Sequence, residues 1–93
     1  MKHRTIETWD QFRADGADYL PNGAQLIDLE YSPETGEGVV LASGLHGKRE
    51  WITWRFFHGD LRTTTWGHYY TDKPEAFREY AARVQDRVLG GAA

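Results

Sequence analysis

The sequence predicts an α+β fold, in which a four-stranded antiparallel meander packs against a C-terminal amphipathic helix in the order α-β-β-β-β-α. Two observations support this prediction. Four segments between residues 24 and 70 are rich in β-forming residues and are separated by turn-forming residues. A later segment, from about residue 74 to residue 89, repeats apolar residues at spacings of three and four, as an amphipathic helix does.

A short helix is expected first, near the N-terminus. Thr8 and Gln11 have the spacing of a capping box, in which two side chains satisfy backbone N–H groups at the start of a helix. Gly16 disfavours its continuation, and residues 18–20 are expected to form one more turn.

The four expected strands are residues 24–31, 39–43, 50–57 and 61–70. Apolar residues alternate with acidic ones in the first of them, which is the period of a half-buried strand. The last two strands hold seven of the thirteen aromatic residues, and His58, Gly59 and Asp60 form a tight turn between them. The hairpin over residues 50–70 should therefore be the centre of the fold.

The C-terminal helix has its own start and stop signals. Asp72 is a suitable N-cap, Pro74 suits the first turn, and Gly90 follows the last turn. Glu79 and Arg83 are spaced for an (i, i+4) ion pair. The apolar stripe consists of Phe77, Tyr80, Ala81, Val84 and Val88. We expect this stripe to cover the sheet face formed mostly by the hairpin.

Length and composition predict a single α+β domain over residues 1–93, with flexible ends at about 1–5 and 90–93. The chain has no cysteine, which excludes disulfides, thiolate metal sites and a cysteine nucleophile. The lack of cysteine is also the basis on which we expect a cytoplasmic location. No apolar run approaches the ~20 residues of a spanning helix, so we expect no membrane contact. A net charge of −3 argues against a generic nucleic-acid binder.

The turn of the hairpin decides which residues share a face. A two-residue loop at residues 59–60 places Trp66 on the face of Arg55, away from Trp54. A three-residue loop over residues 58–60 moves Trp66 to the face of Trp54 instead. We favour the three-residue loop, because it separates apolar from polar residues better.

In either register, an arginine and several rings lie opposite the expected core. One helix cannot cover both faces of the hairpin, so an exposed aromatic patch is expected, and such patches mark interaction sites. Tryptophan, tyrosine and arginine are also the residues most enriched at the hot spots of protein interfaces. The predicted partner-binding residues are Trp51, Arg55, Phe57, Arg62, Trp66 and Tyr69.

No pattern typical of catalysis, metal binding or cofactor binding is present. His58 and Asp60 lie in one turn, whereas His68 lies roughly 25 Å further along an extended strand, too far for one metal site. Neither serine lies in a Gly-x-Ser-x-Gly motif. We therefore expect no catalytic residue, no metal and no cofactor, and the protein is not expected to be an enzyme.

Four stretches carry a resemblance: YSPETGE at residues 31–37, WITW at 51–54, WGHYY at 66–70 and EAFREYAAR at 75–83. Over about two-thirds of its length, the chain resembles small uncharacterised proteins of actinobacteria and their phages. The resemblance brings no catalytic residues with it. It implies a role that is common among phage accessory proteins of this size, which bind and block a host protein.

The predicted function is therefore a non-enzymatic protein-binding module. It is either an accessory protein of a phage or mobile element that acts on a host protein, or a homodimer. One alternative is a single-stranded nucleic-acid binder that stacks bases on the aromatic and arginine face. The other alternative is a small ligand-binding protein or enzyme.

Overall fold

The computed structural model describes residues 4–13 and 18–90 of the chain. Its elements in order are β1 (Arg4–Thr5), the 3-10 turn η1 (Trp9–Gln11), β2 (Asp18–Tyr19), β3 (Gln25–Ser32), β4 (Glu37–Ser43), the 3-10 turn η2 (Leu45–Gly47), β5 (Trp51–Phe57), β6 (Asp60–Tyr70) and α1 (Lys73–Arg87). No helix in this described part of the chain is long and apolar enough to span a membrane.

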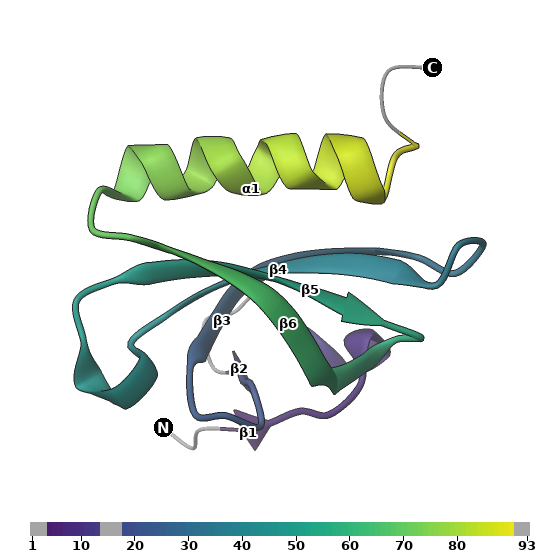
Figure 1. Ribbon diagram of the computed structural model, residues 1–93. Helices are drawn as coiled ribbons and strands as arrows, with labels where there is room; N and C mark the ends of the chain where they lie inside the picture. Colours follow the sequence, from purple (N-terminus) through teal and green to yellow (C-terminus); the bar gives the residue numbers. More distant parts are fainter. Residues whose placement is uncertain (1–3, 14–17, 91–93) are drawn as a thin grey trace.

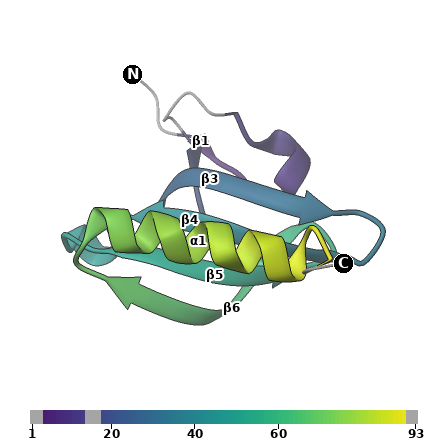
Figure 2. The same cartoon turned by 90° about the horizontal axis from the view of Figure 1, so that it is seen from above.

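The six strands form one sheet in sequence order, from β1 to β6. β1 and β2 are parallel, and every other neighbouring pair is antiparallel. α1 lies along one face of the sheet, above β4 and β5 (Figures 1 and 2). The predicted α+β class with a C-terminal helix packed on a sheet is confirmed. The prediction of four strands in a purely antiparallel sheet is wrong.

The four predicted strands and the C-terminal helix are present within two residues of their expected bounds. The strands that were not predicted, β1 and β2, have two residues each, which is too short for an alternating pattern. β2 occupies part of residues 18–20, where a turn was expected. Gly16 and the outermost expected flexible residues, 1–3 and 91–93, lie outside the described residues.

The expected N-terminal helix is only the single turn η1. Its predicted capping box is present, and the Gln11 side chain accepts a hydrogen bond from the Thr8 backbone N–H at 3.1 Å. The chain leaves the turn in an extended conformation at Phe12 instead of continuing as a helix. The capping signal was therefore right about the position of the turn and did not predict its length.

The sheet curls until the N-terminal segment meets the start of β6. The backbone N–H of Trp9 donates to the Gly59 carbonyl at 3.0 Å, and the N–H of Leu61 donates to the Glu7 carbonyl at 2.8 Å. These contacts enclose the concave face of the sheet. The buried residues of this inner core are Ile6, Leu20, Ala24, Leu26, Leu29, Val40, Ala42, Ile52, Trp54, Phe56 and Leu61.

A second, outer core lies between the convex face of the sheet and α1. Its buried residues are Val39, Leu41, Ala76, Tyr80 and Val84. The helix therefore packs about equally on β4 and on the β5–β6 hairpin, whereas we expected the hairpin to form most of this face. The buried stripe runs at spacings of four through Ala76, Tyr80 and Val84, so that the predicted stripe residues Phe77 and Ala81 face solvent.

β5 and β6 meet in neither of the two registers considered above. His58 and Gly59 have φ angles of 57° and 70°, which is typical of a two-residue type I′ turn, and Phe57 pairs with Asp60. The three-residue loop that we favoured is wrong. The register then shifts twice, and these irregularities place the eleven residues of β6 opposite the seven residues of β5. The inner face keeps Trp54, while Trp66 lies on the other face, as the two-residue alternative predicted.

Candidate functional site

β6 contains a bulge at Trp66 and its neighbour Gly67. Arg55 pairs with Thr65 and Thr53 pairs with His68, so two residues of β6 lie opposite a single residue of β5. Trp66 has a φ of 51°, a left-handed conformation that is uncommon for residues other than glycine and an outlier for a bulky one. The backbone at this position is therefore strained.

The indole ring of Trp66 projects from the bulge and is 58% exposed. The guanidinium carbon of Arg55 lies 4.5 Å from the centroid of this ring and 5.2 Å from that of Phe57. The two rings meet edge to face, with centroids 5.8 Å apart. We call Arg55, Phe57 and Trp66 the bulge cluster. Its cation–π and ring contacts hold the exposed indole in one orientation.

Arg55 is itself fixed from its other side. Its Nη2 donates a short hydrogen bond to the carboxylate of Glu37 on the neighbouring strand β4, and only 15% of the arginine side chain is exposed. A charge-assisted bond of this kind is stronger than a neutral one. The guanidinium is therefore bound by Glu37 on one side and packs against the two rings on the other.

α1 reaches the bulge through Arg83. Its Nη2 donates to the Trp66 carbonyl oxygen at 2.8 Å, and its Nη1 lies 3.2 Å from both the carbonyl and hydroxyl oxygens of the buried Thr53. A bulge interrupts the ladder of strand hydrogen bonds, and polar backbone groups left inside a protein need other partners. Arg83 supplies such a partner, and it ties the helix to the strained backbone.

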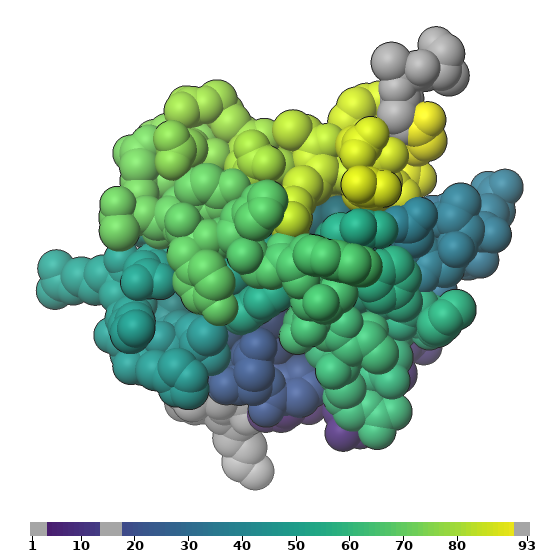
Figure 3. Space-filling view, in the orientation of Figure 1, coloured from purple at the N-terminus to yellow at the C-terminus, as the bar shows by residue number. Residues whose placement is uncertain are grey.

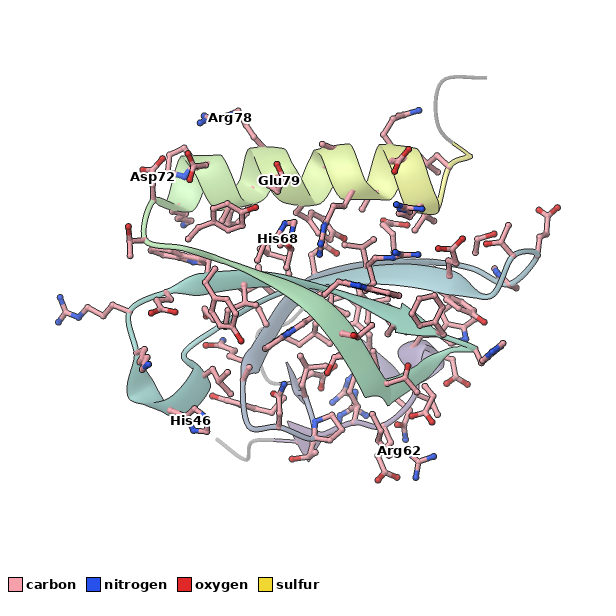
Figure 4. All side chains as sticks on the ribbon, viewed as in Figure 1. His46, Arg62, His68, Asp72, Arg78 and Glu79 are labelled. Carbon is pink, nitrogen blue, oxygen red and sulfur yellow. The ribbon has the colours of Figure 1, made fainter. Side chains whose placement is uncertain are left out.

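A groove opens beside the bulge cluster, between α1 and β6, which lie side by side on this face of the molecule (Figure 3). We call it the α1–β6 groove. Figure 4 shows His68 between the helix and the sheet, whereas Arg78 points away from the sheet. The groove has a volume of about 480 Å³ and is lined by Arg55, Trp66, His68, Glu79, Arg83, Asp86 and Arg87.

The pKa values of Arg83, which lines the groove, and of Tyr70, at the end of β6, are shifted by their surroundings. Burial lowers the pKa of the Arg83 guanidinium; Tyr70 and Glu79 oppose this change, and the positive charges of Arg55 and Arg87 add to it. Burial also raises the pKa of the Tyr70 phenol, and the negative charge of Glu79 adds to that effect. Desolvation therefore acts against charge in this part of the site.

Three of the six predicted partner-binding residues, Arg55, Phe57 and Trp66, are brought together in the bulge cluster. The other three lie apart from it. Trp51 is half-buried against the outer core. Arg62 is at the opposite end of β6 and forms an ion pair of 2.9 Å with Asp60. Tyr69 lies on the other face of the sheet, where its ring meets that of Trp54 at 6.4 Å.

Sequence reasoning missed the main contribution of Arg83, which was expected only to pair with Glu79. Within the described residues, Arg83 makes no ion pair with Glu79 and bonds to the sheet instead. A signal was present, because Arg83 directly precedes Val84 of the buried stripe and so lies at the border of the helix face that meets the sheet. Arg83 binds the carbonyl of the bulge, and apart from the unequal lengths of the two strands, nothing in the sequence indicated that bulge.

The histidines that were weighed as metal ligands do not form a metal site here. Among residues 4–13 and 18–90, no group of three or more histidine, aspartate or glutamate side chains is arranged to hold a metal ion. His68 is instead part of the groove, where its Nδ1 lies 4.0 Å from a Glu79 carboxylate oxygen. Comparisons of the chain with protein-family models, with curated proteins and with solved structures find no match.

Proposed function

We propose that this protein is a non-enzymatic module that binds a protein partner through the bulge cluster. The observation that carries the proposal is Trp66, a strained residue whose large ring is mostly exposed. Strained backbone conformations cost of order 1–3 kcal/mol and cluster at functional sites. A glycine would relieve the strain at this position. A tryptophan at this position therefore adds little to the stability of the isolated fold, whereas its ring adds a large apolar area to a binding surface.

The size of the exposed ring agrees with a role in recognition. A tryptophan buries up to about 250 Å² when it is fully covered, so the exposed part of Trp66 leaves on the order of 100 Å² to bury. Covering that area stabilises a complex by roughly 3 kcal/mol. Because Arg55 and Phe57 already orient the ring, little conformational entropy is lost on binding.

The resemblance to small proteins of actinobacteria and their phages directs the search for the partner. It supports the proposal that the partner is a bacterial host protein, bound by an accessory protein of a phage or mobile element. A second copy of this chain is the other protein partner that the same surface would serve. Light scattering separates the two, because a homodimer has twice the mass of the chain and dissociates in the Trp66→Gly variant.

The charges favour a nucleic-acid partner less than they favour a protein partner. The chain has a net charge of −3, and the carboxylates of Glu79 and Asp86 lie in the groove beside the cluster. Polyanion binding depends on neutralising several phosphates at once. The ring and arginine pair would stack on bases, so filter binding of single-stranded DNA at low salt is the direct test of this alternative.

The proposal is tested by affinity capture from an actinobacterial lysate, followed by calorimetry on the purified partner. Trp66→Gly should weaken the complex at least 30-fold, which corresponds to the roughly 2 kcal/mol typical of a hot spot. Tyr69→Ala is the matched control, because this ring is 56% exposed but lies on the opposite face. Equal effects of the two variants, or no capture by the wild type together with a monomeric mass, would contradict the proposal.

A further inference from the structure

The α1–β6 groove contains a positive charge that no carboxylate balances at close range. Arg55 pairs with Glu37, and Arg87 pairs with Asp86 at 3.1 Å. Among the described residues, Arg83 has no carboxylate oxygen within 4.0 Å. It is the one arginine lining the groove without such a pair.

The hydrogen bonds of Arg83 all go to groups that carry no negative charge. Its Nη1 donates to Thr53, its Nη2 donates to the Trp66 carbonyl oxygen at 2.8 Å, and the same Nη2 lies 3.3 Å from Nε2 of His68. Burial lowers the pKa of this guanidinium, so its surroundings as a whole disfavour its charge. An anion placed beside Arg83 would offset part of that unfavourable contribution.

The apolar part of the same surface is directly next to this charge. Trp66 belongs both to the bulge cluster and to the lining of the groove, and its carbonyl oxygen is bound by Arg83. A ligand that covers the indole ring therefore also lies over the opening of the groove. The matching ligand has an apolar side chain beside a negatively charged one.

We infer that the α1–β6 groove binds the carboxylate of an aspartate or glutamate in the partner segment whose apolar neighbour covers Trp66, with Arg83 and Arg87 facing that carboxylate. The inference rests on the proposed function and names the chemistry of the partner. The occupant is a short acidic and apolar segment of a protein, not a nucleic-acid strand.

The balance of charges in the groove favours one carboxylate over a chain of phosphates. Glu37 balances Arg55, and the other two arginines of the groove face two carboxylates, Glu79 and Asp86, so with His68 neutral the site has no net positive charge to attract a polyanion. A polyanion would bring further charges against Glu79, Asp86 and an acidic chain. A single carboxylate beside Arg83 meets less repulsion from Glu79 and Asp86 than several phosphates would.

The probe for this inference is a displayed library of random 12-residue peptides, selected on wild-type protein and counter-selected on the Trp66→Gly variant. We expect the recovered peptides to be enriched in aspartate or glutamate next to an apolar residue. The dissociation constant of one synthetic peptide is then measured by the shift of the Trp66 indole N–H signal in NMR spectra, assigned from its absence in Trp66→Phe.

Two arginines of α1 provide a matched pair of variants. Arg87→Gln removes a charge that lines the groove, and we expect it to weaken the peptide 3- to 10-fold. Arg78→Gln removes the same charge from the side of the helix that points away from the sheet (Figure 4), and it should change the affinity less than twofold. Glu79→Gln should tighten binding 2- to 5-fold, because it removes a competing carboxylate. Arg83 is kept, since its loss would also disturb the bulge.

Each other outcome overturns the inference. Trp66-dependent peptides without an acidic residue, or with equal affinity for Arg87→Gln and Arg78→Gln, refute it and leave the proposed protein-binding function standing. A library that yields no Trp66-dependent peptide also refutes it, and the capture experiment above then decides the proposed function separately. Displacement of the peptide by single-stranded oligo-dT at micromolar concentration assigns the groove to nucleic acid instead.

Discussion

The guanidinium of Arg83 donates a hydrogen bond of 2.8 Å to the carbonyl oxygen of Trp66, and this bond joins the only long helix of the described chain to the strained bulge of β6. The carbonyl belongs to a residue with a φ of 51°, in a part of the strand where the regular pairing with β5 is interrupted. The position of the exposed indole therefore depends on the helix as well as on the sheet.

Arg83→Met should lower the free energy of unfolding by about 2–3 kcal/mol, because it leaves the Thr53 and Trp66 oxygens without their donor. Arg78→Met, on the exposed side of the same helix, should change it by less than about 0.5 kcal/mol. Urea denaturation followed by tryptophan fluorescence measures both. Equal stabilities of the two variants would show that the contact contributes nothing.

Trp66→Gly should leave the free energy of unfolding within about 1 kcal/mol of the wild-type value. The relief of strain at the left-handed position offsets the loss of the contacts with Arg55 and Phe57. Thermal and urea denaturation test this expectation. A loss of more than about 2 kcal/mol would mean that the ring is retained for the stability of the fold, and the proposed binding role would lose its main support.

Asp18 should make the stability of the protein depend on pH in the acidic range. Burial of its carboxylate tends to raise its pKa, but hydrogen bonds from the Arg4 side chain at 2.9 Å and the Arg13 backbone N–H at 2.7 Å outweigh this, and the pKa is lowered. A lowered folded-state pKa stabilises the fold above the unfolded-state pKa of about 3.9, and this contribution is lost as the pH falls below it.

The corresponding measurement compares wild type with Asp18→Asn over a series of pH values. We expect the variant to be roughly 2 kcal/mol less stable at pH 7. The difference should shrink between about pH 4 and pH 2, where the wild-type carboxylate takes up its proton. Asp60, whose pKa is lowered mainly by its hydrogen bonds with Arg62, is present in both proteins and cancels in the comparison. A difference that is the same at pH 3 and pH 7 would rule out the charge as the cause.

Tyr80→Phe should be neutral or should stabilise the fold by up to about 1 kcal/mol. The Tyr80 hydroxyl is buried in the outer core without a hydrogen-bond partner among the described residues, and burial raises the pKa of the phenol. Removing an unsatisfied polar atom while keeping the ring removes a desolvation cost. Denaturation of the variant at pH 7 is the measurement. A loss of stability above about 1 kcal/mol would show that the hydroxyl does have a partner.

Much of the fold was predictable because periodicity is a local property. The alternation in β3 and the apolar spacing in α1 need only the residues of those segments. The curl of the sheet was not predictable in the same way. It depends on Leu61 bonding to Glu7, two residues far apart in the sequence, and on strands β1 and β2 of two residues each.

The site was predicted in part for the same reason. Arg55 and Phe57 share a face of β5 by simple alternation, so their proximity followed from the strand itself. Trp66 was placed with the core because the sequence favoured a three-residue loop, whereas the structure has a two-residue turn that puts Trp66 on the face of Arg55. The contacts of Arg83 depend on how α1 crosses the sheet, and no local sequence pattern predicts that crossing.

The bulge also has a consequence for the outer border of the sheet. β6 is the last strand, so beyond its start, which the N-terminal segment covers, one side of it is an edge to which an extended segment of another chain could add itself. A residue in the left-handed conformation breaks the regular row of donors and acceptors along such an edge. Where the ring of Trp66 projects, the addition of a further strand is therefore obstructed, and the irregularity that exposes this ring also disfavours edge-to-edge pairing of the kind that leads to amyloid.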